Sequence, residues 1–93
     1  LEVPGAFEIP VVISRNVNHY DGFIALGSII KGETPNFTFI SAAITNALIQ
    51  LSILYKKPIG NAVLTCLNES QAKKRNTKGY EAAIAVTDVL NVK

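Results

Sequence analysis

The chain has 93 residues, of which 48% are hydrophobic and 17% are charged, and its formal net charge is +2. A chain of this length forms at most one small domain, and so small a charge gives no support for binding to nucleic acid. We therefore expect residues 1–93 to form a single domain whose surplus apolar surface is covered by a subunit interface, a missing segment or a membrane.

The N-terminal part predicts a strand end over residues 1–3, a turn, and a helix over about 7–18. The chain starts inside a strand-like pattern and without methionine, so we expect that its N-terminus is truncated, processed or incompletely determined. No signal-peptide pattern is present, and we expect a cytoplasmic protein. The turn is most simply a structural entry to the helix. It also places the Glu8 carboxylate at the carboxyl end of a strand, where open α/β sheets bind ligands.

Two apolar runs, over residues 22–30 and 60–67, predict strands. Both runs are nearly continuous rather than alternating, which is typical of parallel strands with helices on both faces. After the first strand, the loop Gly32-Glu33-Thr34-Pro35 leads into a helix over about 36–55. This junction joins a strand tip to a helix N-terminus, whose free N–H groups and positive dipole end suit a phosphate.

The helix over 36–55 has no charged residue between Phe37 and Tyr55, so a membrane span is one interpretation. Against it, polar residues interrupt the run, and several of them share one narrow helix face: Thr38, Ser41, Thr45 and Ser52. Apolar side chains occupy most of the remaining surface. This pattern favours a helix buried on two sides, against its own sheet and against a neighbouring molecule.

Helices over about 69–75 and 78–90 complete the chain. The alternation of strands and helices predicts βαβ units and a parallel sheet, which is the α/β class. The only basic cluster, Lys73-Lys74-Arg75, is interpreted as a solvated helix face rather than a binding patch. With one cysteine, Cys66, and one histidine, His19, the sequence gives no support for an internal disulfide or a metal site. We expect Cys66 in the core and His19 in solvent.

Several segments together resemble the lumazine synthase family, in the right order and with nearly the right spacing. The matching segments are 3–10 (VPGAFEIP), 25–34 (ALGSIIKGET), 61–65 (NAVLT), 69–75 (ESQAKKR) and 78–83 (KGYEAA). The resemblance covers essentially the whole chain as the C-terminal two-thirds of the family's domain. It implies a flavodoxin-like, three-layer α/β/α sandwich with a parallel sheet that here lacks the N-terminal strand or strands.

The resemblance also implies an activity in riboflavin biosynthesis. In this family, 5-amino-6-(ribitylamino)pyrimidinedione condenses with 3,4-dihydroxy-2-butanone 4-phosphate to give 6,7-dimethyl-8-ribityllumazine, with loss of phosphate and water. No metal or organic cofactor is needed. Because the family's sites form between adjacent subunits, the resemblance implies a homopentamer or a capsid made of pentamers.

Site residues follow from the resemblance position by position. The pyrimidine and its ribityl chain would be met by two groups of residues: Ala6, Phe7 and Glu8, and Ser28, Ile29 and Ile30. The phosphate-bearing substrate would be met by residues of the loop and of the C-terminal part: Glu33, Thr34, Arg75 and Lys78. Asn61 falls at a ring-contacting position that is often aromatic in the family. Asn36 takes the position of the family's catalytic histidine.

The chain departs from the family in ways that bear on activity. An imidazole shuttles protons at neutral pH whereas the Asn36 amide does not, and losing a general acid–base costs about a hundred- to ten-thousand-fold in rate. The family has further N-terminal residues, including a central strand and an aromatic residue that stacks on the pyrimidine. The helix before Tyr20 and the loop after Arg75 are also shorter than usual.

Three functions therefore stay open from the sequence. The first is a lumazine synthase, impaired by Asn36. The second is a non-catalytic relic that acts as an assembly or ligand-binding protein. The third is a small flavodoxin-like binding module, although no phospho-acceptor aspartate cluster or FMN loop is recognisable. In each case we expect that the chain as given is not a stable monomer.

Overall fold

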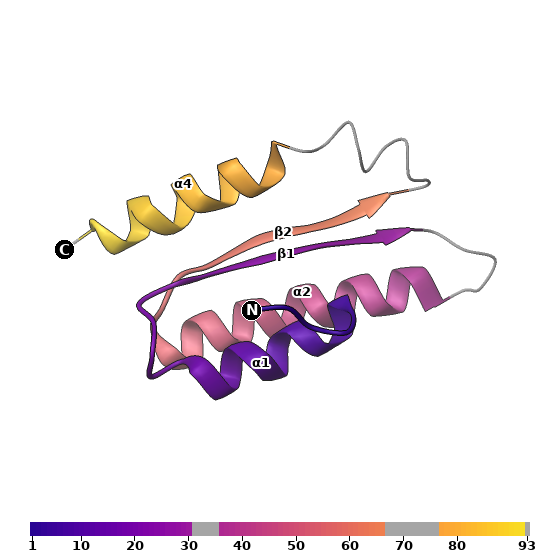
Figure 1. The fold of residues 1–93 in the computed structure, drawn as a ribbon, viewed down its shortest axis with the longest axis horizontal. Coiled ribbons are helices and arrows are strands. Elements are labelled where there is room, and N and C mark those ends of the chain that lie inside the picture. Colours follow the sequence, from indigo (N-terminus) through magenta and orange to yellow (C-terminus); the bar gives the residue numbers. More distant parts are fainter. Residues whose placement is uncertain (31–35, 67–76, 93) are drawn as a thin grey trace.

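The computed structural model describes residues 1–30, 36–66 and 77–92. The elements run in the order η1 (Ala6–Glu8), α1 (Ile9–Asn16), β1 (Phe23–Ile30), α2 (Asn36–Tyr55), β2 (Ile59–Cys66) and α4 (Lys78–Leu90). Strands β1 and β2 form a parallel sheet, with α1 and α2 on one side of it and α4 on the other (Figure 1). The α/β class with a parallel sheet is therefore confirmed.

The register of the sheet decides which backbone groups lie at its outer edges. Phe23 pairs with Ile59 and Ile30 with Cys66, and the Phe23 N–H donates to the Pro58 carbonyl at 3.0 Å. In a parallel ladder, alternate residues of a strand turn their N–H and C=O groups toward the same neighbour. The odd-numbered residues of β1 therefore bond to β2, and the odd-numbered residues of β2 turn away from β1.

The core lies between the sheet and the two helices α1 and α2. It consists of buried side chains from both helices and from β1: Ile9, Ile13, Val17, Ala25, Ile44 and Leu48. The helical members are spaced by four residues, which places them on one stripe of each helix. Leucine and isoleucine pairs at this spacing therefore explain why both helices pack on the same face of the sheet.

The other face of the sheet is covered by α4 through Ala82 and Val86, again four residues apart. Here the approach is close, because a Cβ placed at Gly60 would lie 2.8 Å from the Ala82 carbonyl oxygen. Gly79, in the first turn of α4, lies against Leu26 of β1. Small residues thus allow α4 to rest almost directly on the strands.

Two expectations for the N-terminal part are wrong in detail. Residues 1–3 form no strand, and the sheet of the described residues consists of β1 and β2. The helix expected over 7–18 is shorter: it opens as the 3-10 turn η1 and its α-helical part ends at Asn16. The Asn16 side chain donates to the Val12 carbonyl at 2.7 Å, and the His19 N–H donates to the Asn16 carbonyl. The following turn leaves His19 exposed, as expected.

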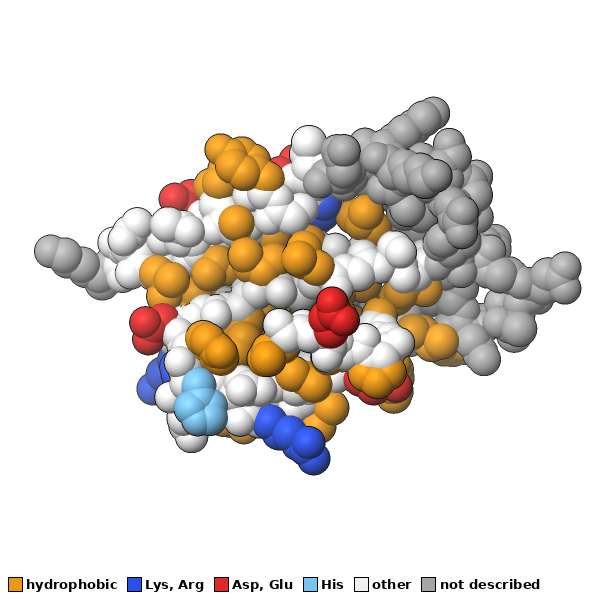
Figure 2. Space-filling view, in the orientation of Figure 1, with side chains coloured by type: hydrophobic (Ala, Val, Ile, Leu, Met, Phe, Trp, Pro, Cys, Tyr) orange, Lys and Arg blue, Asp and Glu red, His pale blue; other side chains and the backbone are white. Residues whose placement is uncertain are grey.

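Helix α2 is the one helix within the described residues whose length and composition would allow it to cross a membrane, over Thr38–Tyr55. Ile44 and Leu48 are buried against the core, whereas Phe39 and Ile53 are 74% and 71% exposed. Burial against its own sheet is therefore confirmed for one side of α2. Cover of its other side by a neighbouring molecule stays a prediction. Figure 2 shows further hydrophobic side chains in a band between α4 and α1.

The end of α2 is fixed by a left-handed residue and a long-range lysine contact. Lys56 has a φ of 56°, and the Lys57 N–H donates to the Ser52 carbonyl at 3.2 Å, a hydrogen bond typical of helix ends. The Lys57 ammonium donates to the carbonyls of Val17 and Tyr20, just beyond α1. It thereby ties the end of α1 to the start of β2. The helix expected over 69–75 lies outside the described residues.

Candidate functional site

The turn η1 lies over the carboxyl half of β1. A Cβ placed at Gly27 would lie 4.0 Å from the Ala6 Cβ, so the turn rests on the strand one residue before Ser28. Gly5 leaves room for the Glu8 carboxylate, whose Oε2 would lie only 3.0 Å from a Cβ at that position. The structure therefore places Ala6 beside Gly27, whereas the side chain of the next residue, Ser28, turns to the α4 face because neighbouring residues of a strand point to opposite faces.

The next two residues of the turn project outward. The Phe7 ring is 65% exposed and Glu8 is exposed. An exposed aromatic ring offers a stacking surface, and a carboxylate accepts hydrogen bonds from amines or hydroxyls. The turn therefore presents chemistry suited to a polar ring system rather than to an apolar ligand.

Beyond Gly27, the end of β1 is divided between surface and core. Ser28 is exposed, whereas Ile29 is half-buried and packs against the core cluster. Ile30 ends the strand opposite Cys66, and only its backbone is described. Asn36 begins α2, again with only the backbone described, so it contributes a helix N-terminus to the region. Glu33, Thr34 and Arg75 lie outside the described residues, and their roles stay predictions.

Asn61 and Lys78 lie apart from this group. Asn61 lies opposite Ala25 of β1. Ala25 precedes Ser28 by three residues, so Asn61 lies about 10 Å from Ser28 along the strand direction. Its Oδ1 accepts a hydrogen bond from the Val63 N–H at 3.0 Å. Lys78 begins α4 on the opposite face of the sheet from η1, and its ammonium lies 3.9 Å from the Glu81 carboxylate. One chain thus assembles only part of the predicted site.

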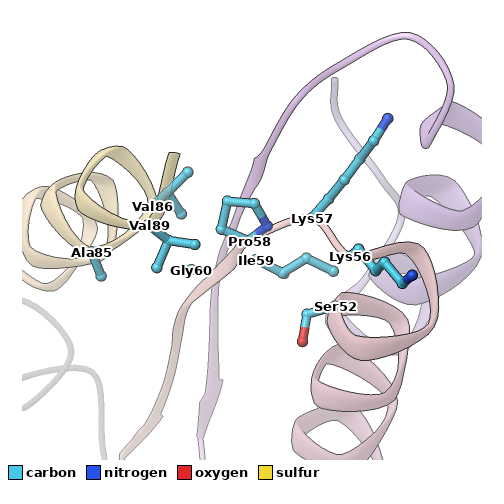
Figure 3. Close-up of a pocket in the computed structure, with 9 residues that line it drawn as sticks. All are labelled: Ser52, Lys56, Lys57, Pro58, Ile59, Gly60, Ala85, Val86 and Val89. Atoms are coloured by element: carbon cyan, nitrogen blue, oxygen red, sulfur yellow. The ribbon is translucent and has the colours of Figure 1, made fainter. Parts of the chain in front are cut away.

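A pocket of about 350 Å³ lies at the other end of the sheet, between the end of α2 and α4 (Figure 3). Its polar side chains are mostly engaged elsewhere. The Ser52 hydroxyl donates to the Ile49 carbonyl at 2.7 Å, and the Lys57 side chain points away toward the end of α1. The exposed Lys56 is the remaining cation along its lining. None of the predicted site residues borders this pocket.

A larger hollow of about 650 Å³ follows the edge of β1 that faces away from β2. It is walled by residues 1–3, by α1 and by the first half of β1. Ile24 and Leu26 lie along it, and Leu26 is 64% exposed. The hollow is mainly apolar and again excludes the predicted site residues. Within residues 1–30, 36–66 and 77–92, no group of three metal-ligating side chains occurs.

Sequence reasoning missed two contacts that the structure shows. Nothing in the local pattern around Lys57 indicates that its ammonium reaches carbonyls 37 and 40 residues earlier in the chain. The bond between Asn61 and Val63 has a weak local signal, because asparagine side chains commonly bond to backbone groups two residues on. A strand interior is nevertheless an unusual place to expect it.

Comparison with known proteins gives a consistent result. The sequence model of the 6,7-dimethyl-8-ribityllumazine synthase family matches residues 1–93. A protein of this name from Cutibacterium acnes is 40% identical over 97% of this chain and 58% of its own length. The protein of this name from Thermobifida fusca is 38% identical over 95% of this chain and 56% of its own length. The one from Desulfovibrio desulfuricans is 36% identical over 99% of this chain and 64% of its own length. The chain thus spans about three-fifths of the length of these relatives.

Proposed function

Because the chain belongs to the 6,7-dimethyl-8-ribityllumazine synthase family, we propose that it acts in riboflavin biosynthesis by forming 6,7-dimethyl-8-ribityllumazine. The substrates would be a ribitylaminopyrimidinedione and dihydroxybutanone phosphate. The protein would act in the cytoplasm. The observation that supports this best is the position of η1 over the carboxyl half of β1, at the end of the sheet where α2 begins.

In this proposal the pyrimidine lies against η1. The exposed Phe7 ring stacks on it, and the Glu8 carboxylate accepts hydrogen bonds from its amino groups or from the ribityl hydroxyls. Ser28 supplies its backbone N–H and C=O, which turn away from β2. The residues therefore orient the amine nucleophile of one substrate beside the helix N-terminus that suits the phosphate of the other.

The second substrate is bound through its phosphate near the start of α2. The first N–H groups of a helix have no partners within the helix and carry the positive end of its dipole, so they favour an anion. We propose that Glu33, Thr34 and Arg75 complete this half of the site together with Lys78 of a neighbouring subunit, because Lys78 of the same chain lies on the opposite face of the sheet. Binding both substrates side by side itself lowers the barrier, because it removes the entropic cost of their encounter.

Proton transfer is the step that this chain performs poorly. Condensation of an amine with a carbonyl and loss of phosphate both require protons to move, and Asn36 has no group that titrates near neutral pH. We therefore propose slow turnover that rests on orientation. The same residue supports a second candidate function, a non-catalytic family member that binds a ligand or assembles with other subunits.

Assembly is part of the proposal. The outward face of α2 exposes Phe39 and Ile53, and Asn61 lies far from η1 within one chain. An oligomer, a pentamer or a capsid of pentamers, would cover the apolar face and place Asn61 of one subunit near η1 of another.

The test is a lumazine-formation assay on the chain and its Asn36→His variant, with product absorbance set against the uncatalysed reaction. We expect the variant to be faster by about a hundred- to ten-thousand-fold, because it regains a general acid–base. Asn36→Gln, which lengthens the side chain without a titrating group, is the matched control and should show no gain. If the folded Asn36→His protein stays at background, the catalytic proposal is wrong and the binding role is favoured.

A further inference from the structure

The outer edge of β2, which faces away from β1, carries backbone donors whose direction follows from the register. The Phe23 N–H donates to the Pro58 carbonyl, and Phe23 lies opposite Ile59. Even-numbered residues of β2 such as Ala62 therefore bond to β1. The N–H groups of Asn61 and Val63 point the other way, to the edge where a further strand would add.

One of these outward donors is already occupied. The Val63 N–H donates to the Asn61 Oδ1 at 3.0 Å, so a side chain of the same strand takes the place that a neighbouring strand's carbonyl would fill. The Val63 side chain meanwhile packs against the core, which keeps its N–H pointing outward. Asn61 itself is exposed. The bond therefore lies at the surface, in the middle of the strand.

The sequence of β2 shows why such a bond matters. Exposed strand edges pair readily with other chains, and proteins usually block them with charged residues, proline or bulges. Over Ile59–Cys66 there is no charged residue and no proline. The paired residues run without interruption from Phe23 opposite Ile59 to Ile30 opposite Cys66, so no bulge bends the strand.

We propose that Asn61 closes the outer edge of β2 to strand addition. Its amide oxygen satisfies the Val63 N–H, and its amide group occupies the space in which a neighbouring backbone would lie. Another polypeptide then meets this edge through side chains and not by continuing the sheet. With Oδ1 engaged, Asn61 offers its Nδ2 hydrogens to that polypeptide, so a carbonyl or carboxylate is the group that fits there. The inference is independent of the catalytic proposal.

Residue-resolved amide hydrogen exchange tests the proposal directly. In Asn61→Val, which favours a strand but has no acceptor, we expect Val63 to exchange about 2- to 12-fold faster at low protein concentration. Ala62, whose N–H bonds to β1, is the internal reference and should keep its rate. Raising the concentration of Asn61→Val should restore protection at Val63, as strands from other chains pair there. An unchanged Val63 rate, or equal changes at Val63 and Ala62, would overturn the proposal.

Asn61→Asp keeps the test decisive even if the valine variant does not fold. Its carboxylate is a stronger acceptor, so Val63 should exchange more slowly relative to Ala62 than in the unchanged chain. Below about pH 4 the carboxyl group is protonated and this extra protection should disappear. If the ratio of the Val63 exchange rate to the Ala62 exchange rate at neutral pH is the same in Asn61→Asp and in the unchanged chain, the Val63 N–H does not bond to the side chain of residue 61.

Discussion

The two faces of the sheet are packed by opposite means. On the face of α1 and α2, branched side chains such as Ile9, Ile13 and Leu48 fill the space between helix and strand. On the face of α4, the space is removed instead: Gly60 lets the helix backbone approach until no side chain fits between them. Close packing on the first face depends on the volume of the side chains there. Close packing on the second face depends on Gly60 having no side chain.

The largest expected effect comes from removing volume on the first face. Leu48→Ala should lower the free energy of unfolding by about 2–5 kcal/mol, because it leaves a cavity among rigid neighbours. Ile53→Ala, on the exposed side of the same helix, is the control and should cost less than about 0.5 kcal/mol. Urea unfolding followed by circular dichroism measures both. Equal losses for the two variants would show that the outward side of α2 is buried in an assembly.

Adding volume on the second face should cost somewhat less. Gly60→Ala places a Cβ 2.8 Å from the Ala82 carbonyl oxygen, so α4 must shift, at about 1–3 kcal/mol. Gly27→Ala is the matched control on the first face, where the new Cβ would meet Ile9 and Ala6 at 3.9 and 4.0 Å, an ordinary contact. The same unfolding measurement should show little change or a slight gain for Gly27→Ala. A larger loss at Gly27 than at Gly60 would reverse the comparison.

The smallest expected effect concerns the lysine that ties α1 to the start of β2. Lys57→Met keeps the aliphatic stem and loses the donors to the carbonyls of Val17 and Tyr20, which should cost about 1 kcal/mol. Lys56→Met removes the neighbouring charge without these bonds and serves as the control. If Lys57→Met loses as much stability in 1 M salt as at low salt, the cause is lost packing, because salt would screen a charge–dipole attraction.

Periodicity alone was enough to place most elements. The apolar runs located both strands to within one residue, and α2 has the bounds that the sequence indicated. Residues 1–3 were misjudged because a strand exists only where a partner strand accepts its hydrogen bonds, and local composition does not report on partners. The length of α1 was overestimated because its last turn is decided by Asn16 and the following turn, not by apolar spacing.

The candidate site was harder to predict than the fold. The turn at Ala6 lies against Gly27 in the second half of β1, because both belong to the same strand–helix layer, and the binding roles of these segments stay predictions. The contact of Asn61 with a ring stays a prediction, whereas the bond of its amide oxygen to the Val63 N–H of the same strand was not foreseen, because its direction depends on the register of the sheet. The roles of Glu33, Thr34 and Arg75 stay predictions, as do the pentamer and the effect of Asn36.

The parallel pairing of β1 and β2 also has a consequence for how the chain folds. Every rung of this sheet joins residues 36 positions apart, as Phe23 and Ile59 do, with the whole of α2 in between. No hairpin can therefore nucleate the sheet, and the entropic cost of closing this loop precedes any gain from the rungs. We expect α2 to become helical before the strands pair, which would leave its apolar residues exposed during the slowest step of folding. Synthesis at high concentration would then favour association before folding is complete.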